Sequence, residues 1–181
     1  IGCQPGSELI FLWWEINSLD QDFVLYNKGG LYRKWYGNLN WVLNYGCNGI
    51  NVISAKGQLS NKNYYFKPHI SWTRVSSKLN MRYYDKRLVF DNTSPAIFND
   101  LFYLLGFYNS NVCENKRLEL YSGNKIESGY INSLAPIEIT QSIKIKVEKI
   151  VDENISMSKK DWDSFETSWD FTKHPLIKFG R

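Results

Sequence analysis

The side chains with the most chemical capacity in this sequence lie in residues 28–90, where cations and amides alternate with aromatic rings. The stretch holds eleven Lys or Arg and one acid, Asp85, while the whole 181-residue chain has a net charge of +4. Twelve aromatic residues and eight asparagines lie in the same stretch. Lysine and arginine bind phosphates, and arginine and asparagine can read base edges. A solvated face usually mixes both signs of charge, so this pattern favours a polyanion-binding surface over a merely basic sheet face.

Ten residues of the stretch are candidates for contacts with nucleic acid. A turn bounded by glycines carries Arg33, Lys34 and Asn38, and such turns point side chains toward solvent. Trp35 either stacks on a sugar or base or supports the turn from the core. The full set is Lys28, Lys62, Lys67 and Lys78 for phosphates, Arg74 and Arg82 for base edges, and Arg33, Lys34, Trp35 and Asn38 on the turn.

Motifs for catalysis are scarce. The sequence has no Gly-rich dinucleotide motif and no P-loop. Its two histidines, His69 and His174, are far apart, and His69 is expected to be structural or to face phosphate. No asparagine precedes a proline, so the Asn/Asp-Pro-Pro-aromatic signature of amino-group methyltransferases is absent. We therefore expect this chain to bind rather than to catalyse, with no cofactor or metal of its own.

The remaining composition favours a cytoplasmic protein. Cys3, Cys47 and Cys113 form no CxxC pair, so neither a disulfide framework nor a zinc site is indicated. The longest apolar run, residues 101–108, is too short to span a bilayer, so no membrane partner is expected. No signal peptide is visible, and the sequence begins with Ile1 rather than Met, which suggests a piece of a longer protein.

Short apolar segments predict strands in the first half of the chain. Residues 39–45 read as a strand after the turn at 37–38, and Asn48-Gly49 is a hairpin signal. Residues 11–16 are apolar but do not distinguish helix from strand. Further strand-like pieces occur at residues 50–54, 64–66, 70–75, 81–84 and 88–90.

The second half predicts helices. Ser94 as N-cap and Pro95 at the first position predict a helix over 95–107, and a second short helix is expected around 112–121. Apolar spacing over 143–151 favours a helix over a strand, and residues 158–161 can form a capping box. The expected fold is α+β. A twisted, mostly antiparallel sheet with long loops, residues 30–91, is packed against helices from the C-terminal half.

Several of these segments together resemble a known family. The sequence is similar to the specificity region of the adenine-specific DNA methyltransferases of BREX phage-defence systems, the PglX family, which are kin to fused type II restriction-modification enzymes. The resemblance covers nearly the whole chain, because residues 2–6 and 14–16 match the opening of that region. The motifs that carry it are residues 28–30, 33–38, 65–67, 70–73, 82–83 and 161–171.

The resemblance implies a division of labour within a longer enzyme. A catalytic domain elsewhere in the parent chain would bind S-adenosylmethionine, flip an adenine from double-stranded DNA and methylate its N6. Residues 1–157 would form the target-recognition domain that chooses the adenine, with a basic β-rich part at 28–91 and a helical part at 94–157. Residues 158–181, acidic and rich in tryptophan, would dock on the parent enzyme, close this domain or begin the next region.

Two other functions are compatible with the residues. A β-rich module for carbohydrate or protein could use the seven tryptophans and twelve tyrosines as stacking platforms. It would bind almost independently of salt, whereas phosphate binding weakens steeply as salt rises. A nuclease activity, as in fused restriction enzymes, is disfavoured by the missing metal-site motif.

Overall fold

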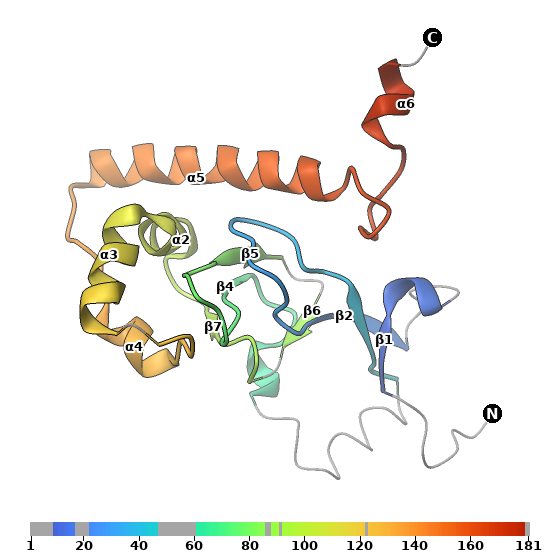
Figure 1. The fold of residues 1–181 in the computed structure, drawn as a ribbon, viewed down its shortest axis with the longest axis horizontal. Coiled ribbons are helices and arrows are strands. Elements are labelled where there is room, and N and C mark those ends of the chain that lie inside the picture. Colours follow the sequence, from blue (N-terminus) through green and yellow to red (C-terminus); the bar gives the residue numbers. More distant parts are fainter. Residues whose placement is uncertain are drawn as a thin grey trace.

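A computed structural model describes residues 9–16, 22–46, 61–85, 88–90, 92–121 and 123–179. Within these ranges the chain mixes strands and helices, which confirms the predicted α+β class. Figure 1 shows the strands in the middle of the molecule, with the long helix α5 lying across one side. The hairpin expected at residues 47–49 and the strand expected at 50–54 lie outside the described residues.

The strands form two sheets rather than the single sheet expected. The first has the order β1-β3-β2-β6, in which β2 pairs in parallel with β6 and the other pairs are antiparallel. Its strands are β1 (Ile10–Leu12), β2 (Phe23–Asn27), β3 (Trp41–Asn44) and β6 (Leu88–Phe90). The second is antiparallel in the order β5-β4-β7, formed by β4 (His69–Ser71), β5 (Arg82–Tyr84) and β7 (Ala96–Ile97).

Five α-helices and two 3-10 helices occur in the described part of the chain. They are η1 (Trp13–Glu15), η2 (Lys62–Tyr64), α2 (Leu101–Asn109), α3 (Asn111–Leu120), α4 (Ser128–Ser133), α5 (Gln141–Trp162) and α6 (Pro175–Phe179). The helices predicted at 112–121 and 143–151 are confirmed as α3 and as part of α5. The side chain of Ser110 caps α3 by accepting a hydrogen bond from the Cys113 amide at 3.1 Å.

Three local predictions are wrong. The helix expected from Pro95 begins at Leu101, because Ala96 and Ile97 pair with β4 instead and Ser94 caps no helix. The strand expected at 64–66 is replaced by the end of η2 and by Phe66 with a φ of 58°. The capping box expected at 158–161 does not start a helix, since α5 continues unbroken to Trp162.

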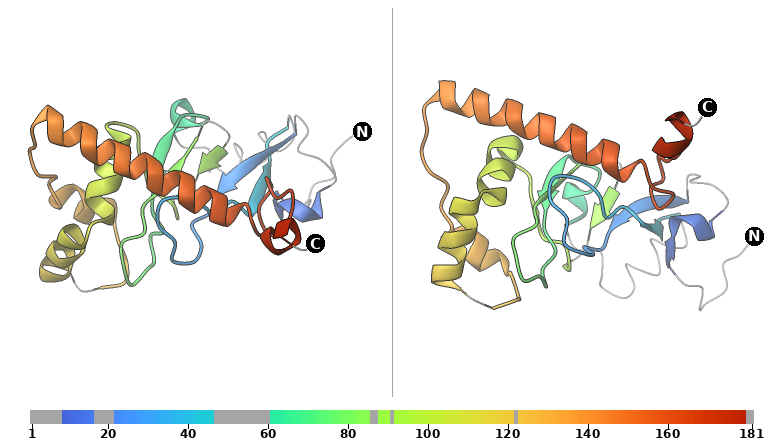
Figure 2. Two further views of the ribbon diagram at one scale, coloured as in Figure 1. Left: turned by 90° about the horizontal axis from the view of Figure 1, so that it is seen from above. Right: turned by 45° about the horizontal axis from the view of Figure 1, so that its top comes forward.

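The helices close the core from one side. α2 packs against β4 and β5 and, on its other side, against α5 (Figure 2). Gly106 lets α2 and α5 approach closely, because a Cβ there would lie 2.9 Å from Cγ2 of Val151. The buried core combines side chains of both sheets with α2, α3, α4 and α5.

The C-terminal part of α5 and the turns after it pack on the rest of the chain. Trp162 is buried in the core, and Trp169 makes an edge-to-face contact with Trp13 at 5.2 Å. The indole Nε1 of Trp13 donates to the carbonyl of Thr167 at 2.8 Å. α5 also passes through residue 157, where the sequence suggested a division, so the helical part and the start of the acidic segment share one helix.

Candidate nucleic-acid interface

Two long loops that carry most of the predicted site residues lie side by side and are joined from within. We call residues 28–38 and 72–80 the loop pair. Arg82, fully buried, connects them: its guanidinium donates to the carbonyl of Arg33 at 3.1 Å and to Oγ1 of Thr73 at 3.0 Å. It also donates to the carbonyl and to Oδ1 of Asn80, each at 3.2 Å, and to Oη of Tyr84 at 2.8 Å. Arg82, predicted to read bases, instead has its donors inside the protein.

Trp35 and Asn38 shape the first loop rather than extend from it. Both have positive φ, 73° and 60°, a conformation that asparagine tolerates and tryptophan rarely adopts. The backbone of Trp35 is held by two hydrogen bonds, from its amide to the carbonyl of Met81 at 2.9 Å and from the amide of Tyr83 to its carbonyl at 2.8 Å. Asn38 is nearly buried, and its side-chain amide donates to the carbonyl of Leu31 at 2.8 Å.

Arg33 and Lys34 tie the same loop to the helices. Arg33 forms an ion pair with Asp161, and its guanidinium lies 5.0 Å from the ring of Trp162. The Lys34 ammonium donates to the carbonyl of Asn109 at 2.8 Å, where a cation complements the negative end of the α2 dipole. Burial lowers the pKa of Lys34, Lys78 adds to this effect and Glu114 opposes it. Both predicted contacts are therefore only partly available to a ligand.

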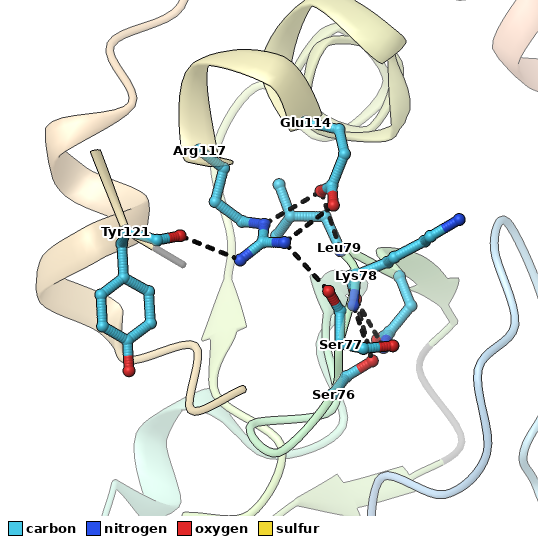
Figure 3. A network of polar contacts seen from close by, with 8 residues as sticks. Ser76, Ser77, Lys78, Leu79, Glu114, Arg117 and Tyr121 are labelled. Atoms are coloured by element: carbon cyan, nitrogen blue, oxygen red, sulfur yellow. Dashed lines mark hydrogen bonds and ion pairs between the residues drawn. The ribbon is translucent and has the colours of Figure 1, made fainter. Parts of the chain in front are cut away.

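The second loop is held against α3 by a polar network that contains a buried ion pair (Figure 3). The Arg117 guanidinium, 2% exposed, makes two hydrogen bonds to Glu114 at 2.8 and 3.0 Å and one to the carbonyl of Ser77 at 2.9 Å. Glu114 also accepts from the amide of Leu79 at 3.1 Å. The network fixes the backbone on either side of Lys78, whose side chain is exposed.

The outward surface of the loop pair combines cations with exposed apolar groups. Leu31 is 86% exposed, and Tyr32 and Val75 are also exposed. Lys28 and Lys78 are exposed on the same two loops, and the Lys28 ammonium lies 4.4 Å from the centre of the Trp41 ring. Cations beside flat or apolar groups suit a nucleic-acid backbone with its sugars and bases.

A cleft with a volume of about 690 Å³ lies next to the loop pair. Arg74 lines it and makes a bidentate ion pair with Glu127 at 2.8 and 2.9 Å. Lys62 and Lys67 are exposed near Tyr64, another lining residue, and the Lys67 ammonium lies 5.5 Å from the Tyr64 ring. Lys62 and Lys67 thus lie at a second location beside the loop pair, and Arg74, a residue of the loop pair, also lines the cleft.

Sequence reasoning missed the aromatic lining of this cleft and the exposed apolar residues of the first loop. The cleft rings Phe90 and Phe98 come from β6 and from the segment after β7, which the sequence suggested was helical. Leu31 and Tyr32, directly after Gly29 and Gly30, were a usable signal, because apolar residues in a glycine-bounded loop have little core to enter.

Other site types are not found in the described parts of the chain. Within them, no group of three or more His, Cys, Asp or Glu could hold a metal ion. None of the helices described is long and apolar enough to span a membrane.

Comparison with known proteins relates the chain to a segment of adenine-specific methyltransferases, which confirms the resemblance seen in the sequence. The first relative is the adenine-specific methyltransferase BrxX of Escherichia coli O9:H4 (strain HS), 36% identical over 153 residues that cover 83% of this chain. The second is the adenine-specific methyltransferase PglX of Lacticaseibacillus casei (strain Zhang), 33% identical over 171 residues and 87% of this chain. The matches span only 13% and 14% of those proteins. No model of a protein family matches the chain.

Proposed function

We propose that this chain binds double-stranded DNA and selects the target site for an S-adenosylmethionine-dependent adenine-N6 methyltransferase of a phage-defence or restriction-modification system. The observation that carries the proposal is the loop pair, in which buried Arg82 and Arg117 hold two loops whose outer surface presents Lys28 and Lys78. Similarity to the methyltransferases BrxX and PglX supports DNA as the partner and S-adenosylmethionine as the cofactor of a catalytic domain in the same parent chain.

Within this proposal the residues have distinct roles. Lys28 and Lys78 contact phosphates, as do Lys62 and Lys67 beside the cleft, and these contacts set the register without reading sequence. Leu31 and Tyr32 lie against sugars or base edges. Arg82, Trp35 and Asn38 act indirectly, by holding the loops in shape.

The proposal is tested by binding of the chain to random-sequence duplex DNA across a salt series. Affinity should fall steeply with salt, and replacing Lys28 and Lys78 together by alanine should lower the slope of log affinity against log salt by about 1.8, since each lost phosphate contact removes about 0.9. Lys149→Ala, an exposed position on α5, is the matched control and should leave the slope unchanged. Binding that is flat with salt would favour a carbohydrate- or protein-binding module instead, whereas steeply salt-dependent binding unaffected by the double change would show that Lys28 and Lys78 do not contact phosphates.

A docking face for the catalytic domain is proposed on α5. Ile143, Ile150 and Met157 are exposed and seven residues apart, so they form one stripe along the outer side of the helix. The relatives are about seven times longer than the matched segment, so a neighbouring domain is available to cover this stripe. In the parent enzyme, Ile150→Glu should lower methylation while leaving duplex affinity of the present chain intact; equal activity would remove this assignment.

A further inference from the structure

The cleft beside the loop pair has features of a site for one flat, hydrogen-bonding group. Its volume of about 690 Å³ lies within the range of small-molecule sites. Its walls come from η2, from the end of β6 and the turn after it, from the segment between β7 and α2, and from Glu127 before α4. We propose that this cleft binds a single unpaired nucleobase of the DNA strand, an inference that rests on the proposed function.

Three aromatic rings provide a stacking surface in the cleft. Tyr64 is 47% exposed and lies 4.7 Å from Phe98, ring centre to ring centre, and Phe90 lies 5.7 Å from Phe98. His69 supports Phe90 and Phe98 from below at 5.3 and 5.5 Å. It is fully buried, and burial lowers its pKa despite the hydrogen bond to the carbonyl of Lys67, so the support is an uncharged ring at neutral pH. Every base has a π-face, so such a surface accepts any of them.

Polar side chains around the rings fit the edge of a base. Asn61, Asn92 and Asn99 line the cleft and are exposed, and a side-chain amide offers both a donor and an acceptor for paired hydrogen bonds. The Arg74–Glu127 pair adds further donors and acceptors at the cleft wall. A purely apolar ligand would remove this ion pair from water without compensation, so the chemistry favours a polar planar ligand.

The position of the cleft indicates where the base comes from. Arg74 belongs both to the loop pair and to the cleft wall, and its amide donates to the carbonyl of Thr93 at 3.2 Å. Lys67 stands over the Tyr64 ring and can neutralise the phosphate attached to an extruded nucleotide. A strand lying along the loop pair therefore passes the cleft mouth, and an unpaired base costs little to bring into it.

The test uses three duplexes of equal length: fully paired, with a single unpaired base, and with an abasic residue at the same place. The chain should bind the duplex with the unpaired base at least about fivefold to tenfold more tightly than the abasic one, the lower end of the range expected for one base stacked on an aromatic side chain. Tyr64→Ala should abolish this ratio and Tyr64→Phe should keep it. Phe165→Ala, a similarly exposed aromatic residue outside the cleft, is the matched control and should leave the ratio unchanged.

The outcomes separate the inference from the function on which it rests. Salt-dependent duplex binding with no preference for the unpaired base would overturn the cleft assignment and leave the proposed function standing. Equal preference for the unpaired base and the abasic residue would mean that the cleft senses a distorted backbone, which also overturns it. A preference that survives Tyr64→Ala would place the base elsewhere. No binding to any duplex would overturn the proposed function and the inference together.

Discussion

Replacing Arg117 by methionine should unfold the chain at a clearly lower denaturant concentration. The guanidinium is 2% exposed and makes four hydrogen bonds, two to Glu114 and one each to the carbonyls of Ser77 and Tyr121. Removing it leaves the Glu114 carboxylate, 17% exposed, with the amide of Leu79 as its remaining partner among the bonds described above. Breaking a buried ion pair by removing one partner costs about 3–5 kcal/mol.

Partial exposure of Glu114 lets water reach the orphaned carboxylate, so the lower end of that range, about 3 kcal/mol, is expected. For a chain of this size about 1 kcal/mol shifts the midpoint of thermal unfolding by roughly 2–4 °C, so the shift should be about 6–12 °C. Urea unfolding gives the free energy and thermal scanning the midpoint. Lys116→Met, an exposed change on the same helix, should cost little. A loss below about 1 kcal/mol for Arg117→Met would refute the view that this pair fixes the second loop.

Lowering the pH should remove the stability that the same interaction contributes. Burial alone would raise the pKa of Glu114, but the hydrogen bonds from Arg117 and from the Leu79 amide, with the nearby positive charge, outweigh it and hold that pKa below the usual 4.5. The folded carboxyl therefore binds its proton less tightly than the unfolded one. Its contribution to stability is present above the unfolded pKa and is lost as pH falls through the folded pKa. Glu114→Gln should reduce this loss below pH 4.5; an identical acid profile would contradict the assignment.

Three substitutions and one labelling experiment test other parts of the structure. Arg82→Met should lower the free energy of unfolding by about 3 kcal/mol or more, because several buried acceptors lose a charged donor, and should weaken duplex binding; urea unfolding and a binding titration measure the two effects. Gly106→Ala should lower the free energy of unfolding by about 1–3 kcal/mol, because the added methyl group crowds Val151. Gly129→Ala, with open space around its Cβ position in helix α4, should be neutral or slightly stabilising. Thermal scanning measures both effects. Burial raises the pKa of Cys113 to about 11, so the folded chain should resist alkylation at this position at pH 8 and react once denatured, as read by mass spectrometry; rapid labelling of the native chain would be inconsistent with this burial.

Local patterns in the sequence predict that a helix forms, but they do not fix which of its apolar residues are buried. The middle of α5 is predicted from apolar spacing over 143–151, and the helix is present, but Val151 is buried while Ile143 and Ile150 are exposed. The helix expected from Pro95 does not form there. Ser94-Pro95 is a local signal for a helix start, but Ala96 and Ile97 pair with β4, which lies far away in the sequence. Non-local pairing overrode the local preference.

The same distinction holds for the candidate site. Charge and turn chemistry predict a site on the loop around Arg33, and the structure places that loop next to Thr73, whose Oγ1 donates to the carbonyl of Gly30 and accepts from Arg82. They could not tell that Arg82 is internal, because a guanidinium looks the same in sequence whether it faces phosphate or a set of protein carbonyls. Its burial depends on acceptors supplied by both loops of the loop pair.

In the loop pair, the residues that hold the backbone in place differ from the residues that form the outer surface. Arg82, Thr73 and Asn80 work from inside, while Leu31 and Val75 point outward. Under the proposed function, substitutions at the outer positions should change the preferred DNA site without altering the path of the backbone. For protein engineering, the outer positions of the loop pair can be varied separately from the internal ones. A library randomised at positions 31, 32, 75 and 78, with the internal residues left fixed, should yield folded proteins that differ mainly in the DNA sequence they prefer.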